Sequence, residues 1–412
     1  MAAPTVRPVH DEELAAFIGV QRTAMLHGPP GDDDVAVRRA LWPAGRALAA
    51  FDAEGTLCGT ARSFPTDLRV PGGSVRAGAV SSVGVLPTHR RQGHLSRLMS
   101  AQLADVAARE EPVAILVSAE WPIYGRYGYG VATEACGVRL DAVTAAFRDP
   151  PTGSTVLVEA KAFREALTDV YERTWQRTPG HMTWDEPWDD VWAGLREIHD
   201  GGDEARRLAV KVVWRDGAGE VQGAAAYSVR DAWVDNRPRG GLTTSIFLAA
   251  TDEAERELYR YLTTVDWVAT VQVGLRPVDD PLPFRLVDGR AAVLADRFDH
   301  IWLRVLDVPA ALGARGYGAM GSFVIEVVDP DGFGGGRFAL DAGPDGAECV
   351  PAPRRSPDLV APITALGAAY LGGLSWARLA AAGWVDERRP GAVAEASAMF
   401  TAPRAPWCST PF

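Results

Sequence analysis

The chain has 412 residues, of which 47% are hydrophobic and 23% charged, a composition that predicts two or three soluble globular domains rather than one compact core. Its formal net charge of -11 at pH 7 argues against a nucleic-acid partner, which favours a basic surface, and suits a cationic partner such as an amine. No apolar run approaches the ~20 residues of a membrane-spanning helix, and residues 1–10 lack a signal-peptide pattern, so we expect a cytoplasmic protein with no membrane partner.

The first region, taken as residues 1–150, shows alternating strands and a helix. Strand-like patterns occur at 47–52, 57–68 and 75–85, and a short buried-type strand is expected at 113–117. Residues 93–109 carry apolar side chains at the spacing of a helix with one buried face. The order strand, loop, helix, strand is typical of an α/β domain.

Two further regions follow the linker Pro150-Pro151-Thr152-Gly153. The second, residues 151–300, predicts strands at 208–213, 223–229, 245–249 and 270–273 and helices at 162–173 and 252–263. The third, residues 301–412, begins with a strand at 301–306 and then mixes strands and helices. Its glycine run, 332–336, is interpreted as a hairpin tip, because no phosphate-loop Lys, Ser or Thr follows it. The whole chain is therefore expected to be of the mixed α/β (α+β) class.

Cysteine and histidine patterns give no sign of metal chemistry. The four cysteines, Cys58, Cys136, Cys349 and Cys408, form no CxxC pair, and the seven histidines include no HExxH motif. We therefore expect neither a disulfide framework nor a bound metal.

The most informative segment is residues 81–98. A strand ends at Val85, a basic loop with Arg90 and Arg91 follows, and a helix begins near Gly93. A helix N-terminus presents unpaired backbone N–H groups and the positive end of the helix dipole, and a glycine there lets a phosphate approach the backbone. By itself this pattern is weak, since an ordinary basic turn could cap an ordinary helix. Its position between a strand and an amphipathic helix that leads to another strand strengthens the prediction of an anion site.

This segment resembles the acetyl-CoA signature of the GCN5-related N-acetyltransferases (GNAT), and the chain as a whole resembles the Eis family of actinobacterial N-acetyltransferases. The matching stretches, in the family's order, are 83–93, 120–133, 171–180, 280–283, 303–317 and 371–373. The resemblance implies a catalytic GNAT domain at 1–150, a GNAT-like domain without cofactor at 151–300, and a sterol-carrier-like domain at 301–412. The sequence agrees on the second domain, because the helix after residue 251 opens with Asp252, Glu253 and Glu255, which would repel a pyrophosphate.

The resemblance also implies acetyl-CoA as co-substrate, with no metal. Val83, Gly84 and Val85 are expected to flank its acetyl and pantetheine portions, and Ala119 and Glu120 to line it. The pyrophosphate is expected on the main-chain N–H groups of Arg91, Gln92, Gly93, His94, Leu95 and Ser96. Gly84, in the middle of a strand, suggests a β-bulge, although a small residue chosen for packing is the alternative.

Two catalytic roles follow from the same resemblance. Tyr124 matches the family's general acid, and a phenol with a pKa near ~10 is protonated at neutral pH. Tyr127 and Tyr129, in the same stretch, are then structural. The C-terminal carboxylate of Phe412 is the family's base; the alternative is a frayed tail, but Trp407 and Phe412 are costly to leave in water.

The expected function is acetyl-CoA-dependent N-acetylation of primary amines on a polycationic small molecule such as an aminoglycoside, by direct attack on the thioester. The resemblance further implies a symmetric homo-oligomer, a hexamer. Ser82 and Pro411 depart from the family's substrate-pocket pattern and leave the amine open. The alternatives are a protein lysine, another amine metabolite, or a non-catalytic acyl-CoA-binding or lipid-binding protein.

Overall fold

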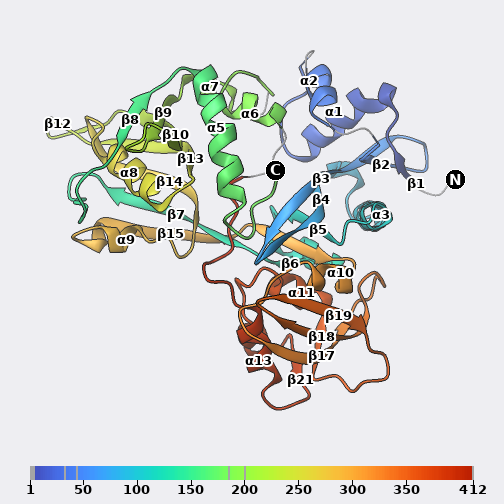
Figure 1. The fold of residues 1–412 in the computed structure, drawn as a ribbon. Coiled ribbons are helices and arrows are strands. Elements are labelled where there is room, and N and C mark those ends of the chain that lie inside the picture. The colour runs from blue at the N-terminus through green and yellow to red at the C-terminus, as the bar shows by residue number, and fades with distance from the viewer. Residues whose placement is uncertain (1–4, 32–33, 43–44, 184–185, 199–200, 411–412) are drawn as a thin grey trace. The chain divides into compact units, whose positions relative to one another are not determined.

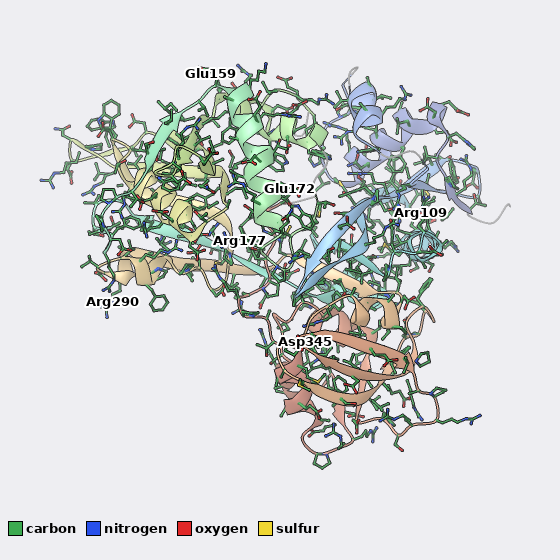
Figure 2. The ribbon with its side chains drawn as sticks, in the orientation of Figure 1. Arg109, Glu159, Glu172, Arg177, Arg290 and Asp345 are labelled. Atoms are coloured by element: carbon green, nitrogen blue, oxygen red, sulfur yellow. The ribbon has the colours of Figure 1, made fainter. Side chains whose placement is uncertain are left out.

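The computed structural model describes residues 5–31, 34–42, 45–183, 186–198 and 201–410. The chain forms two compact units. Unit 1 contains residues up to Thr133 together with Asp299–Pro406, and unit 2 contains Glu134–Phe298 together with Trp407–Thr410. Exposed charged side chains, among them Glu159, Arg290 and Asp345, extend from their surfaces (Figure 2). Among the described residues, no helix is both long and apolar enough to cross a membrane.

The first sheet of unit 1 has seven strands in the order β1-β2-β3-β4-β5-β16-β6. Its strands are β1 (Thr5–Pro8), β2 (Ala47–Phe51), β3 (Leu57–Val70), β4 (Gly73–Val85), β5 (Val113–Val117), β6 (Gly130–Val131) and β16 (Ile301–Val305). Strands β1 to β4 form an antiparallel meander, whereas β4 and β5 are parallel. The associated helices are α1 (Leu14–Ala24), α2 (Asp34–Leu41), α3 (His94–Ala108) and α4 (Trp121–Tyr124).

Strand β16 returns to this sheet after the whole of unit 2 has been traversed. It lies between β5 and β6 and is antiparallel to both, so that an orange strand lies beside the teal β6 in Figure 1. The sequence predicts this strand correctly as an element, but it groups the strand with the third region. Local patterning reveals a strand without showing which sheet it joins.

The sheet of unit 2 also has seven strands, in the order β15-β7-β14-β13-β10-β9-β8. Its strands are β7 (Glu134–Asp141), β8 (Ser154–Leu157), β9 (Val210–Arg215), β10 (Val221–Arg230), β13 (Gly240–Ala249), β14 (Val268–Pro277) and β15 (Ala292–Asp299), and β11 (Trp233–Val234) with β12 (Arg237–Pro238) forms a small separate ribbon. The helices are α5 (Ala160–Trp175), α6 (Glu186–Trp192), α7 (Asp203–Leu208), α8 (Asp252–Thr263) and α9 (Leu282–Arg285). Strand β7, which precedes residue 150, pairs in this second sheet.

A third sheet, in the order β19-β18-β17-β20-β21, completes unit 1. It comprises β17 (Gly321–Val328), β18 (Gly336–Gly343), β19 (Gly346–Pro351), β20 (Leu359–Pro362) and β21 (Asp386–Glu387), with helices α10 (Val308–Gly313), α11 (Ile363–Ala369), α12 (Trp376–Ala381) and α13 (Ala392–Phe400). The glycine run at 332–336 connects the antiparallel strands β17 and β18, as the sequence predicts. Helix α11 packs against β6 and β16, so this sheet is joined to the first one through that helix (Figure 1).

Candidate active site

Strand β4 carries a bulge near its C-terminal end. Thr60 pairs with Gly84 and Arg62 with Ser81, so β4 has one residue more than β3 over this stretch. Ser82 adopts a positive φ of 55°, and its carbonyl accepts a hydrogen bond of 2.8 Å from the Thr60 hydroxyl. The sequence attributes the bulge to Gly84, but a Cβ on Gly84 would lie 2.7 Å from the Cβ of Ala24. The bulge is therefore present at Ser82–Val83, while Gly84 makes room for α1.

The first sheet opens beside this bulge. Strands β4 and β5 pair only at residues 77–79 with 113–115, although β4 continues to Val85 and β5 to Val117. Along residues 80–85 the edge of β4 that faces β5 thus has no strand beside it among the described residues. Backbone groups of Val83, Gly84 and Val85 border this opening, and their contact with a cofactor stays a prediction.

The loop after β4 leaves the N-terminus of α3 uncapped. A 3-10 turn, Pro87–His89, leads to Arg91 with φ 62° and to Gly93, the N-cap, with φ 82°. No side chain of the described residues caps the helix, and its first intrahelical bond runs from the N–H of Arg97 to the carbonyl of Gly93. The N–H groups of His94, Leu95 and Ser96 therefore have no acceptor within the helix and can bind an anion.

The side chains around that N-terminus take different roles. Arg97, which sequence analysis did not single out, donates from Nη1 to the carbonyl of Gln92 at 3.3 Å and adds a positive charge beside Gly93. Its signal in the sequence is a third arginine, after Arg90 and Arg91, one helical turn beyond the glycine. His94 instead turns inward: the residue is 2% exposed, its Nδ1 lies 3.6 Å from the Cys58 sulfur, and burial lowers its pKa. Leu95 is partly buried and packs against the apolar core, so His94 and Leu95 can offer an anion only their backbone.

The three tyrosines of the next loop occupy different environments. Tyr127 hydrogen-bonds through its hydroxyl to Ser96 Oγ at 3.2 Å, and Tyr129 is fully buried. Tyr124 ends α4, and its ring meets that of Tyr129 edge-on with centroids 6.1 Å apart. None of the described residues forms a hydrogen bond with the Tyr124 hydroxyl. Burial, with smaller effects of Tyr127 and Glu120, raises the pKa of Tyr124 to about 12, so this phenol stays protonated at neutral pH.

Ala119 and Glu120 lie between β5 and α4, and both are exposed. The neighbouring Ser118 hydroxyl holds their turn, because it accepts from the N–H of Glu120 at 3.2 Å and donates to the carbonyl of the same residue at 3.0 Å. The exposed side chains of Ala119 and Glu120 can therefore contact a ligand that enters the opening of the sheet.

Unit 2 repeats the strand geometry but not the anion site. Its strand β13 is also bulged, at Ser245, and pairs in parallel with β14 over only part of its length. Helix α8, however, is capped by Thr251, whose hydroxyl accepts from the N–H of Ala254 at 3.1 Å, and its first turn carries three acidic residues. A satisfied, negatively charged N-terminus does not attract a pyrophosphate. The acidic first turn is the one that the sequence indicates, whereas the cap itself is the Thr251 hydroxyl.

The end of the described chain is docked on unit 2. Trp407 is 6% exposed and donates from Nε1 to the carbonyl of Leu275 at 2.7 Å. Its ring contacts that of His181 and lies 5.0 Å from the guanidinium of Arg276. Cys408 and Thr410 are buried too. The tail is therefore held rather than frayed as far as residue 410, while Phe412 lies outside the described residues.

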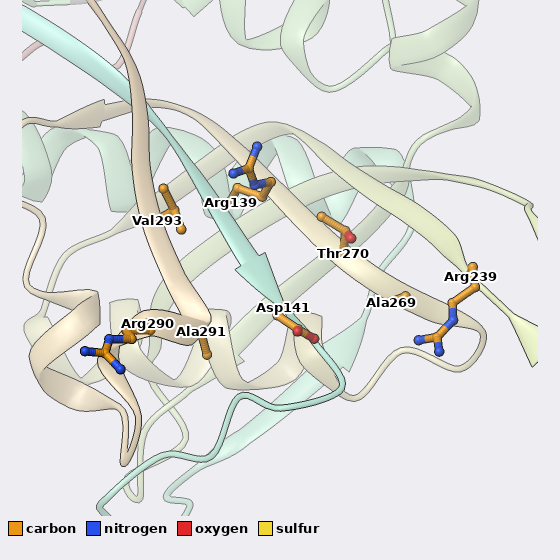
Figure 3. Close-up of a pocket in the computed structure, with 8 residues that line it drawn as sticks. All are labelled: Arg139, Asp141, Arg239, Ala269, Thr270, Arg290, Ala291 and Val293. Atoms are coloured by element: carbon orange, nitrogen blue, oxygen red, sulfur yellow. The ribbon is translucent and has the colours of Figure 1, made fainter.

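A cavity of about 390 Å³ is found elsewhere, in unit 2 (Figure 3). Among its lining residues are Arg139, Arg239 and Arg290, whose guanidinium groups extend in different directions, and the carboxylate of Asp141 (Figure 3). Asp141 is itself engaged, since it accepts hydrogen bonds from the N–H groups of Val143 and Thr144. The cavity contains none of the predicted site residues. The described residues likewise include no cluster of three or more His, Cys, Asp or Glu side chains that could hold a metal ion.

An opened sheet, a bulged strand and an uncapped helix after a basic loop together define an acyltransferase of the GNAT class. Residues 5–132 and 180–305 each match a family model described as an acetyltransferase (GNAT) domain, and residues 308–409 match a sterol carrier protein domain. The chain is 38% identical to an uncharacterized N-acetyltransferase of Streptomyces avermitilis over 99% of this chain and 98% of that protein.

Similarity to named relatives places the chain in one family within the GNAT class. The chain is 35% identical to the N-acetyltransferase Eis of Mycobacterium tuberculosis, over 85% of this chain and 86% of that one. The crystal structure of Eis1 from Mycobacterium abscessus superposes with a TM-score of 0.86 at 34% identity, covering 99% and 100% of the two chains. A GCN5-related N-acetyltransferase from Anabaena variabilis shares the fold, with a TM-score of 0.83 at 18% identity. The chain belongs to the Eis family of N-acetyltransferases. It is therefore an acyltransferase with tandem GNAT domains and a C-terminal sterol-carrier-like domain, and its class uses an acyl-CoA and an amine.

Proposed function

We propose that this enzyme transfers an acetyl group from acetyl-CoA to a primary amine by direct attack, with Tyr124 as the general acid. The observation that carries the proposal is the Tyr124 hydroxyl, which is protonated at neutral pH and makes no hydrogen bond with any described residue. Tyr124 is only partly buried and packs against the cluster that contains Val80 and Leu116, so its hydroxyl is left available to a ligand.

Acetyl-CoA fits the residues of the opening. The uncapped first turn of α3, with Gly93 at its start, provides the N–H groups for the pyrophosphate, and Arg91 and Arg97 add positive charge. Val83, Gly84 and Val85 border the thioester end, where backbone donors can polarise a carbonyl. Ala119 and Glu120 line the opposite side in this proposal. We assign a single acetyl-CoA site to the chain because α8 of unit 2 is capped.

The amine nitrogen forms a bond to the thioester carbon, and the carbon–sulfur bond breaks. The amine loses a proton to the carboxylate of Phe412, directly or through water, and Tyr124 hydrogen-bonds the departing thiolate and supplies its proton. Because an α-carboxylate has a pKa near ~3.5, it needs an apolar surrounding or a water relay to act as a base. The burial of Trp407, Cys408 and Thr410 supports a fixed tail.

For the acceptor, we propose a small cationic amine such as an aminoglycoside, supported by the family and by the net charge of -11. A specific observation favours a second candidate, an amine of lower charge such as a protein lysine or another metabolite. Arg62 on β3 donates from Nε to Ser82 Oγ on the bulge at 3.1 Å, and its guanidinium lies 4.7 Å from the Trp42 ring. Among the described residues no carboxylate pairs with it, and burial and then Arg38 lower the pKa of Arg62 to about 9. A positive charge on Arg62, beside the bulge of β4, would repel a polycationic acceptor.

The deciding experiment is a thiol-release assay with acetyl-CoA against aminoglycosides, polyamines and lysine peptides, followed by mass spectrometry of the product. Release with aminoglycosides supports the first candidate, and release only with singly charged amines supports the second. A variant extended by a few residues beyond Phe412 tests the base, since full activity would remove the terminal carboxylate from the mechanism.

Three further expectations remain proposals. We retain the division at residues 150 and 300 as a description of three functional regions, although β7 of the first region pairs in the second sheet and β16 of the third region pairs in the first. We propose that the enzyme assembles as a hexamer, on the basis of its family, and sedimentation equilibrium would measure the mass. We also propose that it acts in the cytoplasm, which cell fractionation would test.

A further inference from the structure

One fully buried ion pair lies against the tyrosine loop, which we define as residues 124–129 with Tyr124, Tyr127 and Tyr129. Arg304 of β16 donates from Nη2 to both carboxylate oxygens of Asp329, at 2.7 and 2.8 Å, and neither side chain is exposed. Asp329 follows β17 in the sterol-carrier-like domain. Removing two charges from water is expensive, and the attraction between them often does no more than offset that cost. Such a pair is therefore better explained by what it positions than by net stability.

The element that the pair positions is the turn at residues 125–128. A Cβ placed on Gly128, whose φ is +76°, would lie 2.7 Å from Cζ of Arg304, so the turn rests on the guanidinium group. Within the turn, the N–H of Gly128 donates to the carbonyl of Gly125 at 3.1 Å. The N–H of Tyr129 donates to the carbonyl of Tyr124 at 3.3 Å. The guanidinium thus supports the backbone that fixes the direction of the Tyr124 side chain.

The sterol-carrier-like domain holds the other end of this arrangement. The Asp329 carboxylate also accepts from the N–H groups of Asp331 and Gly334, at 3.2 and 2.7 Å, so it is anchored in its own loop. From the same loop, Phe333 packs against the apolar cluster that contains Tyr127 and Tyr129 and borders Tyr124. The tyrosine loop therefore rests on Arg304 of the first sheet, which Asp329 of this domain holds, and it receives an apolar contact from Phe333 of the same domain, all within unit 1.

We propose that Arg304 and Asp329 are positioning residues for acetyl transfer, through which the sterol-carrier-like domain orients the Tyr124 hydroxyl. The proposal rests on the proposed role of Tyr124 as general acid. Neither residue needs to touch the substrates. Because the acetyl-CoA donors belong to α3, disrupting the pair should lower turnover and leave acetyl-CoA affinity nearly unchanged.

A double-mutant cycle tests this coupling. The double substitution R304M/D329N removes both charges together and so avoids stranding one of them in the core. We measure kcat and the Kd for acetyl-CoA of the full-length enzyme, with Tyr124 and with Tyr124→Phe. With Tyr124 present, kcat should fall about tenfold or more, as expected for a misplaced acid. With Tyr124→Phe, the pair substitution should change kcat by less than about twofold, and the Kd should stay within about twofold in both backgrounds.

The chain offers a matched control in a second buried ion pair of unit 1. Arg46 and Glu111 are bidentate, with Nη2 and Oε1 2.6 Å apart, and both side chains are almost fully buried. Glu111 precedes β5, whereas Tyr124 follows it, so this pair lies outside the tyrosine loop. The double substitution R46M/E111Q should lower the Tm to a similar extent and leave kcat within about twofold.

The possible results of the double-mutant cycle lead to different conclusions about Tyr124 and the ion pair. If R304M/D329N lowers kcat by the same factor in both backgrounds, or leaves it unchanged with Tyr124 present, the positioning role is overturned and the proposed acid stands. If Tyr124→Phe alone leaves kcat unchanged, the acid assignment fails and the positioning role fails with it. Should the double variant not fold, Gly128→Ala perturbs the same contact from the loop side and must show the same dependence on Tyr124, or the proposal is wrong.

Discussion

The environment of Tyr124 predicts an unusual alkaline limit of activity. An ordinary tyrosine has a pKa near ~10, and as a general acid it would lose its proton, and the rate with it, as the pH rises through that value. Burial raises the pKa of Tyr124 to about 12, so the proton, and with it the activity, should persist to higher pH. The shift in midpoint is about two pH units.

The size of the effect can be stated at one pH. At pH 10.5 a phenol with a pKa of ~10 is only about one-quarter protonated, whereas a pKa of about 12 leaves about 97% protonated. Initial rates of thiol release, corrected for spontaneous thioester hydrolysis and measured between pH 7 and 11 with saturating amine, separate the two cases. Tyr124→Phe should lower kcat by about 10²–10⁴ at pH 7.5 and leave the Kd for acetyl-CoA nearly unchanged.

Tyr127→Phe is the matched control, because it also removes a hydroxyl from this loop. Among the described residues, the Tyr127 hydroxyl bonds only Ser96. It should cost about 1 kcal/mol of stability and change kcat by less than about twofold. A loss of wild-type activity with a midpoint near pH 10 would refute the reasoning from burial. An equal loss of turnover in both variants would remove the distinction between Tyr124 and its neighbour.

Further predictions concern the cofactor site, the tail and the acceptor. Gly93→Ala places a Cβ on a residue with a φ of 82°, 3.4 Å from Arg97 Nη1, which strains the backbone by about 1–2 kcal/mol. Because that backbone would bind the pyrophosphate, calorimetry should show about tenfold weaker binding of acetyl-CoA. An unchanged affinity would contradict the placement of the pyrophosphate. Equilibrium dialysis should give one acetyl-CoA per chain, and two would show that the capped helix of unit 2 binds it. Trp407→Ala should expose the tail to limited proteolysis and lower kcat, because the buried ring contributes about 3–5 kcal/mol; a protected tail would argue against this anchor. Arg62→Met should raise kcat/KM for aminoglycosides, most clearly at low salt, and no change would separate Arg62 from the acceptor.

Local patterns predicted local elements well. The strand expected at 113–117 is β5, Val113–Val117, and the helix expected at 252–263 is α8, Asp252–Thr263, because both combine a clear hydrophobic pattern with definite end signals. The buried Trp407 was also expected, since a large aromatic residue is costly to leave in water.

The sequence could not show features that tertiary pairing imposes. The positive φ angles at Ser82 and Arg91 belong to residue types that rarely adopt them, and the β3–β4 register and the loop before α3 impose them. The inward direction of His94 depends on the space beside Cys58, and the support of Gly128 by Arg304 joins residues 176 positions apart. No periodicity within a short window carries such information.

Strand β16 follows the other strands of its sheet by a long stretch of sequence, and this affects how the protein can fold while it is being synthesised. About 170 residues separate β6 from β16, and at a synthesis rate of ~5–20 residues per second this amounts to roughly 10–30 s. Until β16 emerges from the ribosome, one edge of β5 has no partner, and an open, apolar edge strand invites pairing with other chains. A fragment that ends near residue 132 would leave this edge of β5 permanently unpaired. It should therefore aggregate unless a peptide spanning Ile301–Val305 is supplied. The catalytic sheet is thus completed only after residue 305 has been made, so residues 1–132 alone lack a strand that their own sheet requires.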